Sequence, residues 1–347
     1  VIVFFLMTAR QAATASYIEY PTSRDTLLSG SEIACRWDEN DVFKAHLFYS
    51  TDAGDSWQEI APQTKHSGVN FPVPYFDNQN ILFKSIAIRI KPIEFIREIP
   101  NAHSSEIRSV EVSPDGSQFI TAGKDGRVVV RDASNFSILD SIILGGKTTY
   151  YASFMHNRDT VLISESNSVV LWDRKSGKQT AYGAANMNDI ARCVASHPTE
   201  NVFAAASYDG RAYVFSPDSQ TAFRVFRNID TFSVYRVKFS PDGKYLLVAG
   251  SNGEVNVWDW RLGSLSQKLI GHGENGQNLL VWSCDASADG KFALTGGVDR
   301  TARLWSMAEG KEIMRITKHT GHLRVSRFHP SYPVFMTASL DSTLCQW

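Results

Sequence analysis

The sequence contains few cysteines, has nearly equal numbers of acidic and basic residues, and has no long apolar run. Its four cysteines, Cys35, Cys193, Cys284 and Cys345, are scattered without C-x-x-C or zinc-type spacing, which predicts neither a disulfide nor a metal site. No stretch approaches the roughly twenty apolar residues that a membrane-spanning helix requires. A formal net charge of −1 argues against a nucleic-acid-binding surface and a polybasic membrane patch.

The short motifs of common enzymes are missing as well. The sequence contains no G-x-S-x-G, no H-E-x-x-H and no glycine loop of the kind that cradles phosphate. His156, His197 and His329 fall in predicted turns, so we interpret them as surface turn residues rather than as converging metal ligands. We therefore predict no catalytic residue and no cofactor.

One stretch shows how the chain is organised. Residues 238–259 read KFSPDGKYLLVAGSNGEVNVWD, in which two apolar runs are bounded by Ser-Pro-Asp-Gly and Ser-Asn-Gly turns. Short β-rich runs between such turns predict antiparallel strands. The pattern recurs at a period of about forty residues, which indicates a repeat architecture.

Six copies of this pattern follow one another. They run over residues 113–132, 157–173, 197–215, 240–259, 287–305 and 329–347, and their last strands end in VVVRD, VVLWD, AYVF, VNVWD, ARLW and TLCQW. The chain from about residue 93 onwards thus resembles the WD40 repeat family. The resemblance implies an all-β, six-bladed propeller, because four-stranded units shield one another by packing radially. A seventh blade remains an alternative if the C-terminus is truncated.

The resemblance also implies a structural hydrogen-bond network in each blade, made of a Trp, a Ser or Thr, a His and an Asp. In the last copy these are Trp347, Thr337 or Ser339, His322 and Asp341; in the fifth they are Trp305, Thr295 or Gly297, His272 and Asp299. Other copies depart from the pattern, with Arg131 and Phe215 in the Trp position and Asn167 and Asn252 in the Asp position. We interpret all of these residues as structural.

The first residues differ from the rest of the chain. Residues 1–15 combine an apolar run with Ala13-Thr14-Ala15, which is typical of a secretory signal peptide that lacks its basic start. A buried strand, or a start at Met7, is the alternative. A cleaved leader predicts an exported protein of the bacterial periplasm or cell surface.

Residues 16–91 contain no Trp-Asp repeat and predict a small β-sandwich of short strands. The order of Trp37, the stretch 50–57 and Val73-Pro74 resembles the immunoglobulin-like or fibronectin-like modules of exported bacterial proteins. The stretch Ser50-Thr-Asp-Ala-Gly-Asp-Ser-Trp57 resembles the Asp-box of sialidases, a turn-stabilising device away from their catalytic centre. After the leader (1–15) and the sandwich (16–91), the propeller forms the third segment, over residues 92–347. Ile93–Ile99 is expected to supply the outer strand of its last blade.

We expect a non-catalytic protein-interaction scaffold of the bacterial envelope that binds a protein or peptide on the propeller's top face. Aromatic and Arg side chains dominate such interfaces, and the candidates are Tyr150, Tyr151, Arg192, Tyr235, Arg236, Trp282, Arg324 and Arg327. Some of them could serve only blade packing. A propeller-fold hydrolase or dehydrogenase is the alternative, and a eukaryotic-type cytoplasmic scaffold is a third interpretation. Oligomeric state and partner identity are not encoded in any pattern that we recognise.

Overall fold

The computed structural model divides into two units, and Ile99–Trp347 belongs to one of them. The structure describes residues 99–347 apart from 146, 184–186, 228–232, 274–279 and 331–333, and before residue 99 it describes the backbone of five strands. The predicted leader at residues 1–15 and the Asp-box turn at 51–57 lie outside the described residues.

The five early strands lie where the sequence predicts strands. They are β1 (Glu32–Arg36), β2 (Phe43–Ser50), β3 (Gln58–Thr64), β4 (Gly68–Pro72) and β5 (Leu82–Arg89). β1 pairs with β4, and β2 lies between β3 and β5; all three pairings are antiparallel. Trp37 is not among the described residues. The sandwich therefore stays a prediction.

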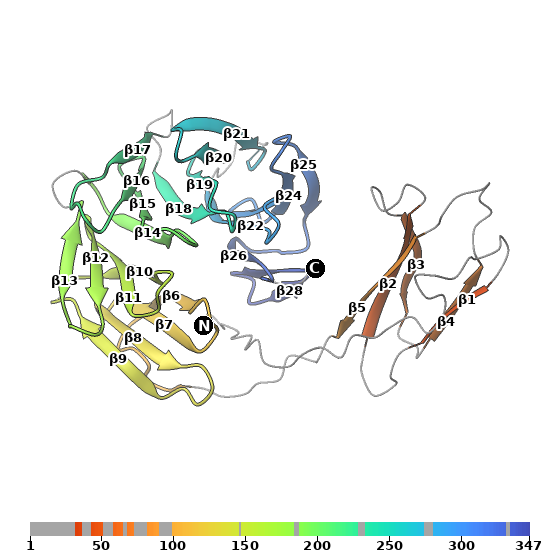
Figure 1. Cartoon of the computed structure of the whole chain (residues 1–347), viewed down its shortest axis with the longest axis horizontal. Coiled ribbons are helices and arrows are strands. Elements are labelled where there is room, and N and C mark those ends of the chain that lie inside the picture. The colour runs from red at the N-terminus through yellow and green to blue at the C-terminus, as the bar shows by residue number, and fades with distance from the viewer. Residues whose placement is uncertain are drawn as a thin grey trace. The chain divides into compact units, whose positions relative to one another are not determined.

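The second unit is a six-bladed propeller, as the repeats predict, and each blade is one antiparallel sheet (Figure 1). Blades one to three contain β6 (Ile107–Val112), β7 (Gln118–Gly123), β8 (Arg127–Asp132) and β9 (Ile138–Ile143); β10 (Thr149–Phe154), β11 (Thr160–Glu165), β12 (Ser168–Asp173) and β13 (Gln179–Tyr182); and β14 (Ala191–Ser196), β15 (Phe203–Ser207), β16 (Arg211–Phe215) and β17 (Arg224–Arg227). Blades four to six contain β18 (Val234–Phe239), β19 (Tyr245–Gly250), β20 (Glu254–Asp259) and β21 (Ser264–Ile270); β22 (Val281–Ala286), β23 (Phe292–Gly297), β24 (Ala302–Ser306) and β25 (Glu312–Ile316); and β26 (Leu323–Phe328), β27 (Phe335–Ser339) and β28 (Leu344–Gln346). Ile93 to Glu98, most of the stretch predicted to complete blade six, lie outside the described residues.

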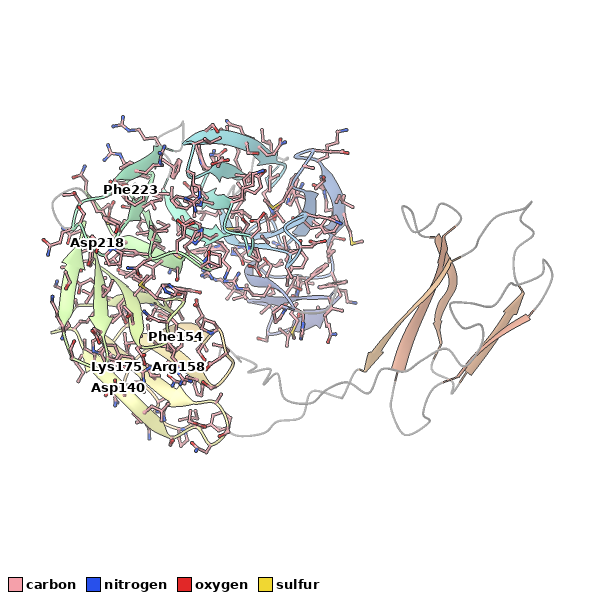
Figure 2. The ribbon with its side chains drawn as sticks, viewed as in Figure 1. Asp140, Phe154, Arg158, Lys175, Asp218 and Phe223 are labelled. Atoms are coloured by element: carbon pink, nitrogen blue, oxygen red, sulfur yellow. The ribbon has the colours of Figure 1, made fainter. Side chains whose placement is uncertain are left out.

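The blades are most deeply buried in their second strands and most exposed at the rim. The first strand of each blade is innermost, and these inner strands contact one another from β6 through β10, β14, β18 and β22 to β26 (Figure 1). The second strands of blades one to five are almost fully buried, whereas the outer strand β9 is largely exposed. Figure 2 shows Asp140 and Lys175 toward the rim and Phe154, which is buried, farther inward. This gradient is expected of blades that shield each other's faces.

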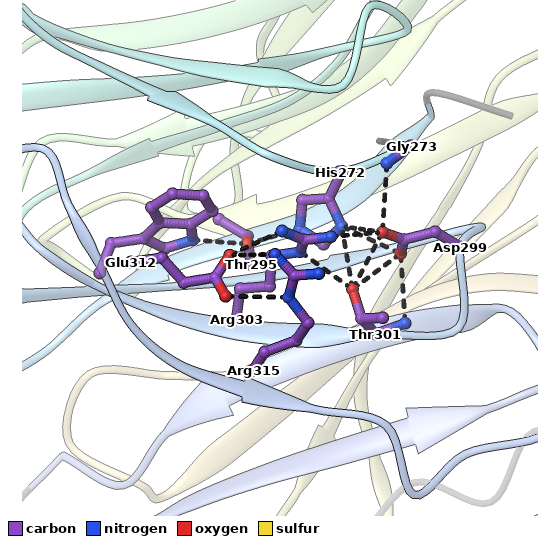
Figure 3. Close-up of polar contacts among 9 residues, drawn as sticks. His272, Gly273, Thr295, Asp299, Thr301, Arg303, Glu312 and Arg315 are labelled. Atoms are coloured by element: carbon purple, nitrogen blue, oxygen red, sulfur yellow. Dashed lines mark hydrogen bonds and ion pairs between the residues drawn. The ribbon is translucent and has the colours of Figure 1, made fainter. Parts of the chain in front are cut away.

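Blade five contains the complete hydrogen-bond chain that the sequence predicts (Figure 3). The Trp305 indole N–H donates to Thr295 Oγ1 at 2.9 Å, and Thr295 Oγ1 lies 2.7 Å from His272 Nε2. His272 Nδ1 lies 2.9 Å from the Asp299 carboxylate. Because the indole can only donate, the Thr295 hydroxyl keeps its own proton for Nε2, and Nδ1–H donates to Asp299. Every polar atom of this chain therefore has a partner, with the imidazole neutral.

The charged groups around this hydrogen-bond chain are paired as well. Burial opposes ionisation of Asp299, but its hydrogen bond with His272 holds the pKa of that carboxyl well below the usual range. Burial lowers the pKa of His272, which agrees with a neutral ring. Arg303 is buried and donates to Asp299 at 3.2 Å and to Glu312 at 2.6 Å. A buried guanidinium is stable only when it is paired in this way.

Blade six uses a different histidine from the one expected. His319 Nδ1 lies 3.0 Å from Asp341, His319 Nε2 lies 2.8 Å from Thr337 Oγ1, and the Trp347 indole donates to that hydroxyl at 2.9 Å. His322 directly precedes β26, and its backbone carbonyl accepts from Leu340 N at 2.9 Å. The prediction of His322 is wrong because it followed the Gly-His pair at 321–322. His319 lies 22 residues before its Asp, the same separation as in blade one.

Blades one and three depart from this Trp–Thr–His–Asp hydrogen-bond chain, each in a different way. In blade one His103 contacts Asp125 at 3.0 Å and Thr121 at 2.8 Å, but Arg131 stands in the Trp position and donates instead to Phe136 O. In blade three the positions of the His, the Thr and the Trp hold three buried apolar residues of one core cluster: Met187, Ala205 and Phe215. Blade three thus replaces the polar chain with apolar contact, which satisfies the same site without hydrogen bonds.

Blades two and four replace the aspartate by other polar contacts. In blade two the buried Glu165 accepts from Lys147 Nζ at 2.8 Å and from Ser168 Oγ at 2.7 Å. In blade four the side-chain oxygen of Asn252 accepts from Glu254 N at 3.3 Å. Asn252 closes a tight turn much as an aspartate does, because both side chains accept a bond from the backbone two residues on.

His197 is buried, not a surface turn residue as the sequence suggested. Its ring is 1% exposed, Nε2 lies 2.9 Å from Gly243 O in blade four, and Nδ1 accepts from the amides of Thr199 and Glu200 at 3.3 and 2.9 Å. The Trp260 indole donates to the same Gly243 carbonyl at 2.7 Å. His197 therefore joins blade three to blade four.

Two substitutions of Trp305 distinguish the free energy contributed by its packing from that contributed by its hydrogen bond. Trp305 is 1% exposed, so Trp305→Ala is expected to cost about 3–5 kcal/mol of unfolding free energy. Trp305→Phe keeps most of the packing and loses one donor, and we expect a cost of about 1 kcal/mol. Denaturant unfolding measures both. Trp347→Ala is the comparison, and it should cost less because Trp347 is 36% exposed. Equal losses for Ala and Phe at position 305 would contradict this account.

His197 is expected to make stability depend on pH. Burial lowers its pKa below the ordinary 6.5, and protonated Nδ1 would face two amide donors. The folded state therefore favours the neutral ring, so this contribution is present above pH 6.5 and is lost as the pH falls toward the lowered folded pKa. The thermal midpoint of the wild type should fall between pH 7.5 and 5.5.

The matched variants are His197→Asn and His156→Asn, because His156 lies in the equivalent turn of blade two and is exposed. His197→Asn should flatten part of the pH dependence, while His156→Asn should leave the slope of the wild type. An unchanged slope in His197→Asn would show that His197 does not titrate on unfolding. Burial also lowers the pKa of His272 and of His329, so these two residues contribute to the slope that remains.

Candidate functional site

Each inner strand begins with a β-bulge at the same place. In β6, Ile107 pairs with Gly123 and Ser109 with Ala122, so Arg108 has no partner across the ladder. The same register shift recurs in every other blade. The six bulged residues are Arg108, Tyr150, Arg192, Tyr235, Trp282 and Arg324, and we call them the axial ring. Because the inner strands are equivalent, the ring lies on one face, the top face, where those strands begin.

A bulge turns the extra side chain out of the regular alternation of the strand. All six side chains are partly exposed, and five of them contact one another. The Arg324 guanidinium lies 4.1 Å from the Trp282 ring centre, and Arg192 lies 5.9 Å from the same ring. Arg192 belongs to blade three and Trp282 to blade five, so side chains converge across the axis. Such guanidinium–aromatic contacts each contribute about 0.5–1 kcal/mol at exposed sites.

Aromatic contacts complete the ring. Arg192 lies 5.7 Å from the ring centre of Tyr150, and Tyr235 packs edge-on against Trp282 at 5.0 Å. Tyr208, from the turn after β15, packs on Tyr235 at 4.9 Å and extends this aromatic surface outward. The ring is therefore a preformed set of half-buried aromatic and guanidinium groups.

Positive charge is concentrated at the ring. Burial and then the neighbouring Arg192 lower the pKa of Arg324, which shows that like charges lie close together there. Glu106 pairs with Arg108 at 3.1 Å and is itself 54% exposed. No carboxylate pairs with Arg192 or Arg324 within the part of the chain that the structure describes.

Tyr151 and Arg236 lie one residue deeper than the ring. Tyr151 is 7% exposed; its hydroxyl accepts from Arg236 Nη2 at 2.7 Å and donates to Glu111 at 2.9 Å. Burial raises the pKa of Tyr151 well above its ordinary value. These two residues join blades one, two and four internally. Both residues make internal contacts of the blade-packing kind that the sequence analysis left open for some candidates, and the bulge presents the residue before each of them.

Arg327, another of the candidates, also makes internal hydrogen bonds. Its Nη1 donates to Ser326 O at 2.9 Å and to Cys284 O at 3.3 Å. Tyr150, Arg192, Tyr235, Trp282 and Arg324 are the candidates that the structure brings together. Sequence reasoning missed Arg108 and Tyr208. Arg108 occupies the second position of its inner strand, as Arg324 does, so an alignment of these strands would have found it.

Other chemistry is not indicated in the described regions. Cys193 and Cys284 are buried free thiols on β14 and β22, and Cys345 on β28 is free and partly exposed. Among the residues that the structure describes, no three His, Cys, Asp or Glu side chains are grouped as metal ligands would be. Over the same residues, no helix has the length and hydropathy to span a membrane.

The fold and the axial ring define a six-bladed β-propeller, a repeat protein whose inner strands present side chains on one face. The sequence comparison agrees: residues 94–132, 184–216, 224–259, 263–306 and 310–347 match the family described as WD domain, G-beta repeat. The chain belongs to this WD40 repeat family. The matches do not include residues 133–183, which contain blade two, although the structure shows that blade clearly.

Individual relatives are similar at a low level of identity. The chain is 22% identical over 292 residues to a guanine nucleotide-binding protein subunit beta of Saccharomyces cerevisiae, a match that covers 70% of this chain and 67% of that protein. It is 31% identical over 152 residues to the LST8 homolog of Drosophila melanogaster, covering 42% of this chain and 48% of the relative. It is 24% identical over 215 residues to the pre-mRNA-processing factor 19 homolog 2 of Arabidopsis thaliana, covering 60% of this chain but only 39% of that protein.

These relatives correct one prediction. We expected an exported bacterial protein because residues 1–15 look like a truncated leader. Relatives of this chain in Arabidopsis thaliana, Saccharomyces cerevisiae and Drosophila melanogaster are eukaryotic cytoplasmic or nuclear WD40 proteins, so the expected export to a periplasm or cell surface is wrong. A leader-like composition in fifteen residues is weaker than similarity over most of a propeller.

Stability should distinguish the ring from the layer beneath it. Arg236→Gln removes the donor to the buried Tyr151 hydroxyl and should cost about 1.5–3 kcal/mol, the range for hydrogen bonds to charged groups. Arg192→Gln removes two long guanidinium–aromatic contacts and should cost only about 1 kcal/mol. Urea unfolding of the two variants measures the difference. A cost for Arg192→Gln equal to that of Arg236→Gln would mean that the ring is structural.

Proposed function

We propose that this protein is a non-catalytic interaction module that binds a protein or peptide partner on its axial ring. The observation that carries the proposal is the bulge repeated in all six inner strands, which presents three arginines and three aromatic residues at one site. Arg, Tyr and Trp are the residues that dominate binding hot spots. A half-buried, preformed cluster of this kind loses little side-chain entropy when a partner binds.

The family supports the same function. WD40 propellers similar to this chain act as protein-interaction scaffolds, and one relative is by its name a subunit of a larger protein. The alternative of a hydrolase or dehydrogenase has no observation in its favour among the described side chains.

We further propose that residues 16–91 form a second module, an immunoglobulin-like β-sandwich, and that 92–347 is the propeller module. The antiparallel pairings of β1 with β4 and of β2 with β3 and β5 support two sheets of the kind that a sandwich contains. Two modules in one chain fit a scaffold, because each can hold a different partner.

The test compares affinity purification with the full chain and with two matched double variants. Arg192→Glu with Arg324→Glu reverses charge in the ring, while Arg227→Glu with Arg315→Glu makes the same charge change on the outer strands β17 and β25. Partners from an extract of the source cells are identified by mass spectrometry. We expect at least one partner that the wild type and the outer-strand variant retain and the ring variant loses.

Equal retention by both variants would contradict the placement of the site on the ring. Both variants must show the thermal midpoint of the wild type, so that a loss of binding reports the surface and not unfolding.

A further inference from the structure

The axial ring contains more hydrogen-bond donors than its own residues can use. Its three arginines each carry five N–H groups, and they have no acceptor oxygen of their own. Two donor atoms of the ring, Arg108 Nε and Trp282 Nε1, are buried and have no partner among the described residues. Buried donors of this kind are rare in folded proteins, and each needs an explanation.

The guanidinium groups are also held in a defined orientation. Arg324 lies 4.1 Å from the Trp282 ring centre, and Arg192 lies near both Trp282 and Tyr150. When the flat face of a guanidinium rests on an aromatic ring, its N–H groups along the edge remain free for a planar acceptor such as a carboxylate. Arginines fixed in this way lose less entropy on binding than flexible surface arginines do.

The charge of the ring points to the sign of the ligand. Arg192 and Arg324 both approach Trp282, and two like charges that share one aromatic ring repel each other. Glu106 neutralises part of Arg108, but it is more than half exposed, so an incoming anion can compete with it. An anionic group between the guanidiniums would satisfy the donors and remove the repulsion.

The ring's setting argues for a peptide rather than a nucleic acid. The chain as a whole has a formal charge of −1, which does not favour the broad basic surface that a phosphate backbone needs. The three arginines come from blades one, three and six, and aromatic residues occupy the ring positions of the other three blades, which suits successive side chains of an extended segment. Such a segment rises about 3.3 Å per residue.

We infer that the axial ring recognises an acidic peptide segment, whose Asp and Glu carboxylates bind Arg192, Arg324 and Arg108 while its other side chains rest on Trp282 and Tyr235. This inference rests on the proposed function, because it names the chemical class of the partner at the same site. Glu106 is the internal group that the acidic segment displaces from Arg108.

The first experiment is a selection from a random library of displayed 12-residue peptides on the purified full chain. We expect the recovered peptides to be enriched in Asp and Glu relative to the input library. A consensus peptide is then synthesised together with its isosteric version, in which every Asp and Glu is replaced by Asn and Gln. We expect the amide version to bind at least about 10-fold more weakly, as loss of charged hydrogen bonds requires.

Single variants of the protein locate the site. Arg192→Gln and Arg324→Gln should each weaken binding of the consensus peptide about 10-fold or more, and Arg227→Gln on the outer strand β17 should leave it unchanged. Fluorescence anisotropy of the labelled peptide measures all three. Salt should weaken binding to the wild type more than to the ring variants, because fewer charges remain in those variants.

Several results would overturn the inference. They are recovery of no peptides or of peptides without acidic enrichment, equal affinity for the amide version, and equal weakening by Arg227→Gln. A phosphoserine version of the consensus that binds more than about 10-fold tighter than the Asp/Glu peptide would assign the ring to phosphopeptides instead. If the affinity purification still shows a ring-dependent partner while the acidic peptide fails, the proposed function stands and only the chemistry of the ligand is wrong.

Discussion

Every inner strand of this propeller contains one residue more than its neighbouring strand can pair, and the axial ring, the proposed binding surface, depends on this mismatch. In blades one to five the second strand is nearly completely buried, which leaves it little room to accommodate the extra residue. The inner strand therefore bulges, and the unpaired side chain turns onto the top face. Repetition of the same bulge in six blades brings the six residues of the axial ring together around the axis.

The rest of the structure holds the inner strands in place, and it does so with more than one kind of chemistry. Blades five and six use the chain of Trp, Thr, His and Asp, whereas blade three fills the same positions with Met187, Ala205 and Phe215. Beneath the ring, Tyr151 links Arg236 to Glu111 and fixes three blades. These contacts hold the layer beneath the ring, and at the ring itself the guanidinium groups of Arg192 and Arg324 have no carboxylate partner among the described residues.

The sequence predicted the blades and part of the site, since strands and tight turns depend on local residues. The hydrogen-bond chain of blade five could be predicted because all its members lie at motif positions. In blade six the Gly-His pair at 321–322 led to the prediction of His322, whereas the separation of 22 residues between the histidine and the aspartate selects His319. The depth of Tyr151 could not be predicted, because Glu111 and Arg236 come from other blades. The burial of His197 likewise depends on Gly243, a neighbour far along the chain.

Amide hydrogen exchange of the full chain, with and without a bound partner, tests the central claim most directly. If the axial ring is the binding site, a partner will slow exchange at the starts of β6, β10, β14, β18, β22 and β26 and in the turn at Tyr208, while exchange on the outer strands β9, β13, β17, β21 and β25 will stay the same. Slower exchange confined to the outer strands, with no change at the bulges, would contradict this account.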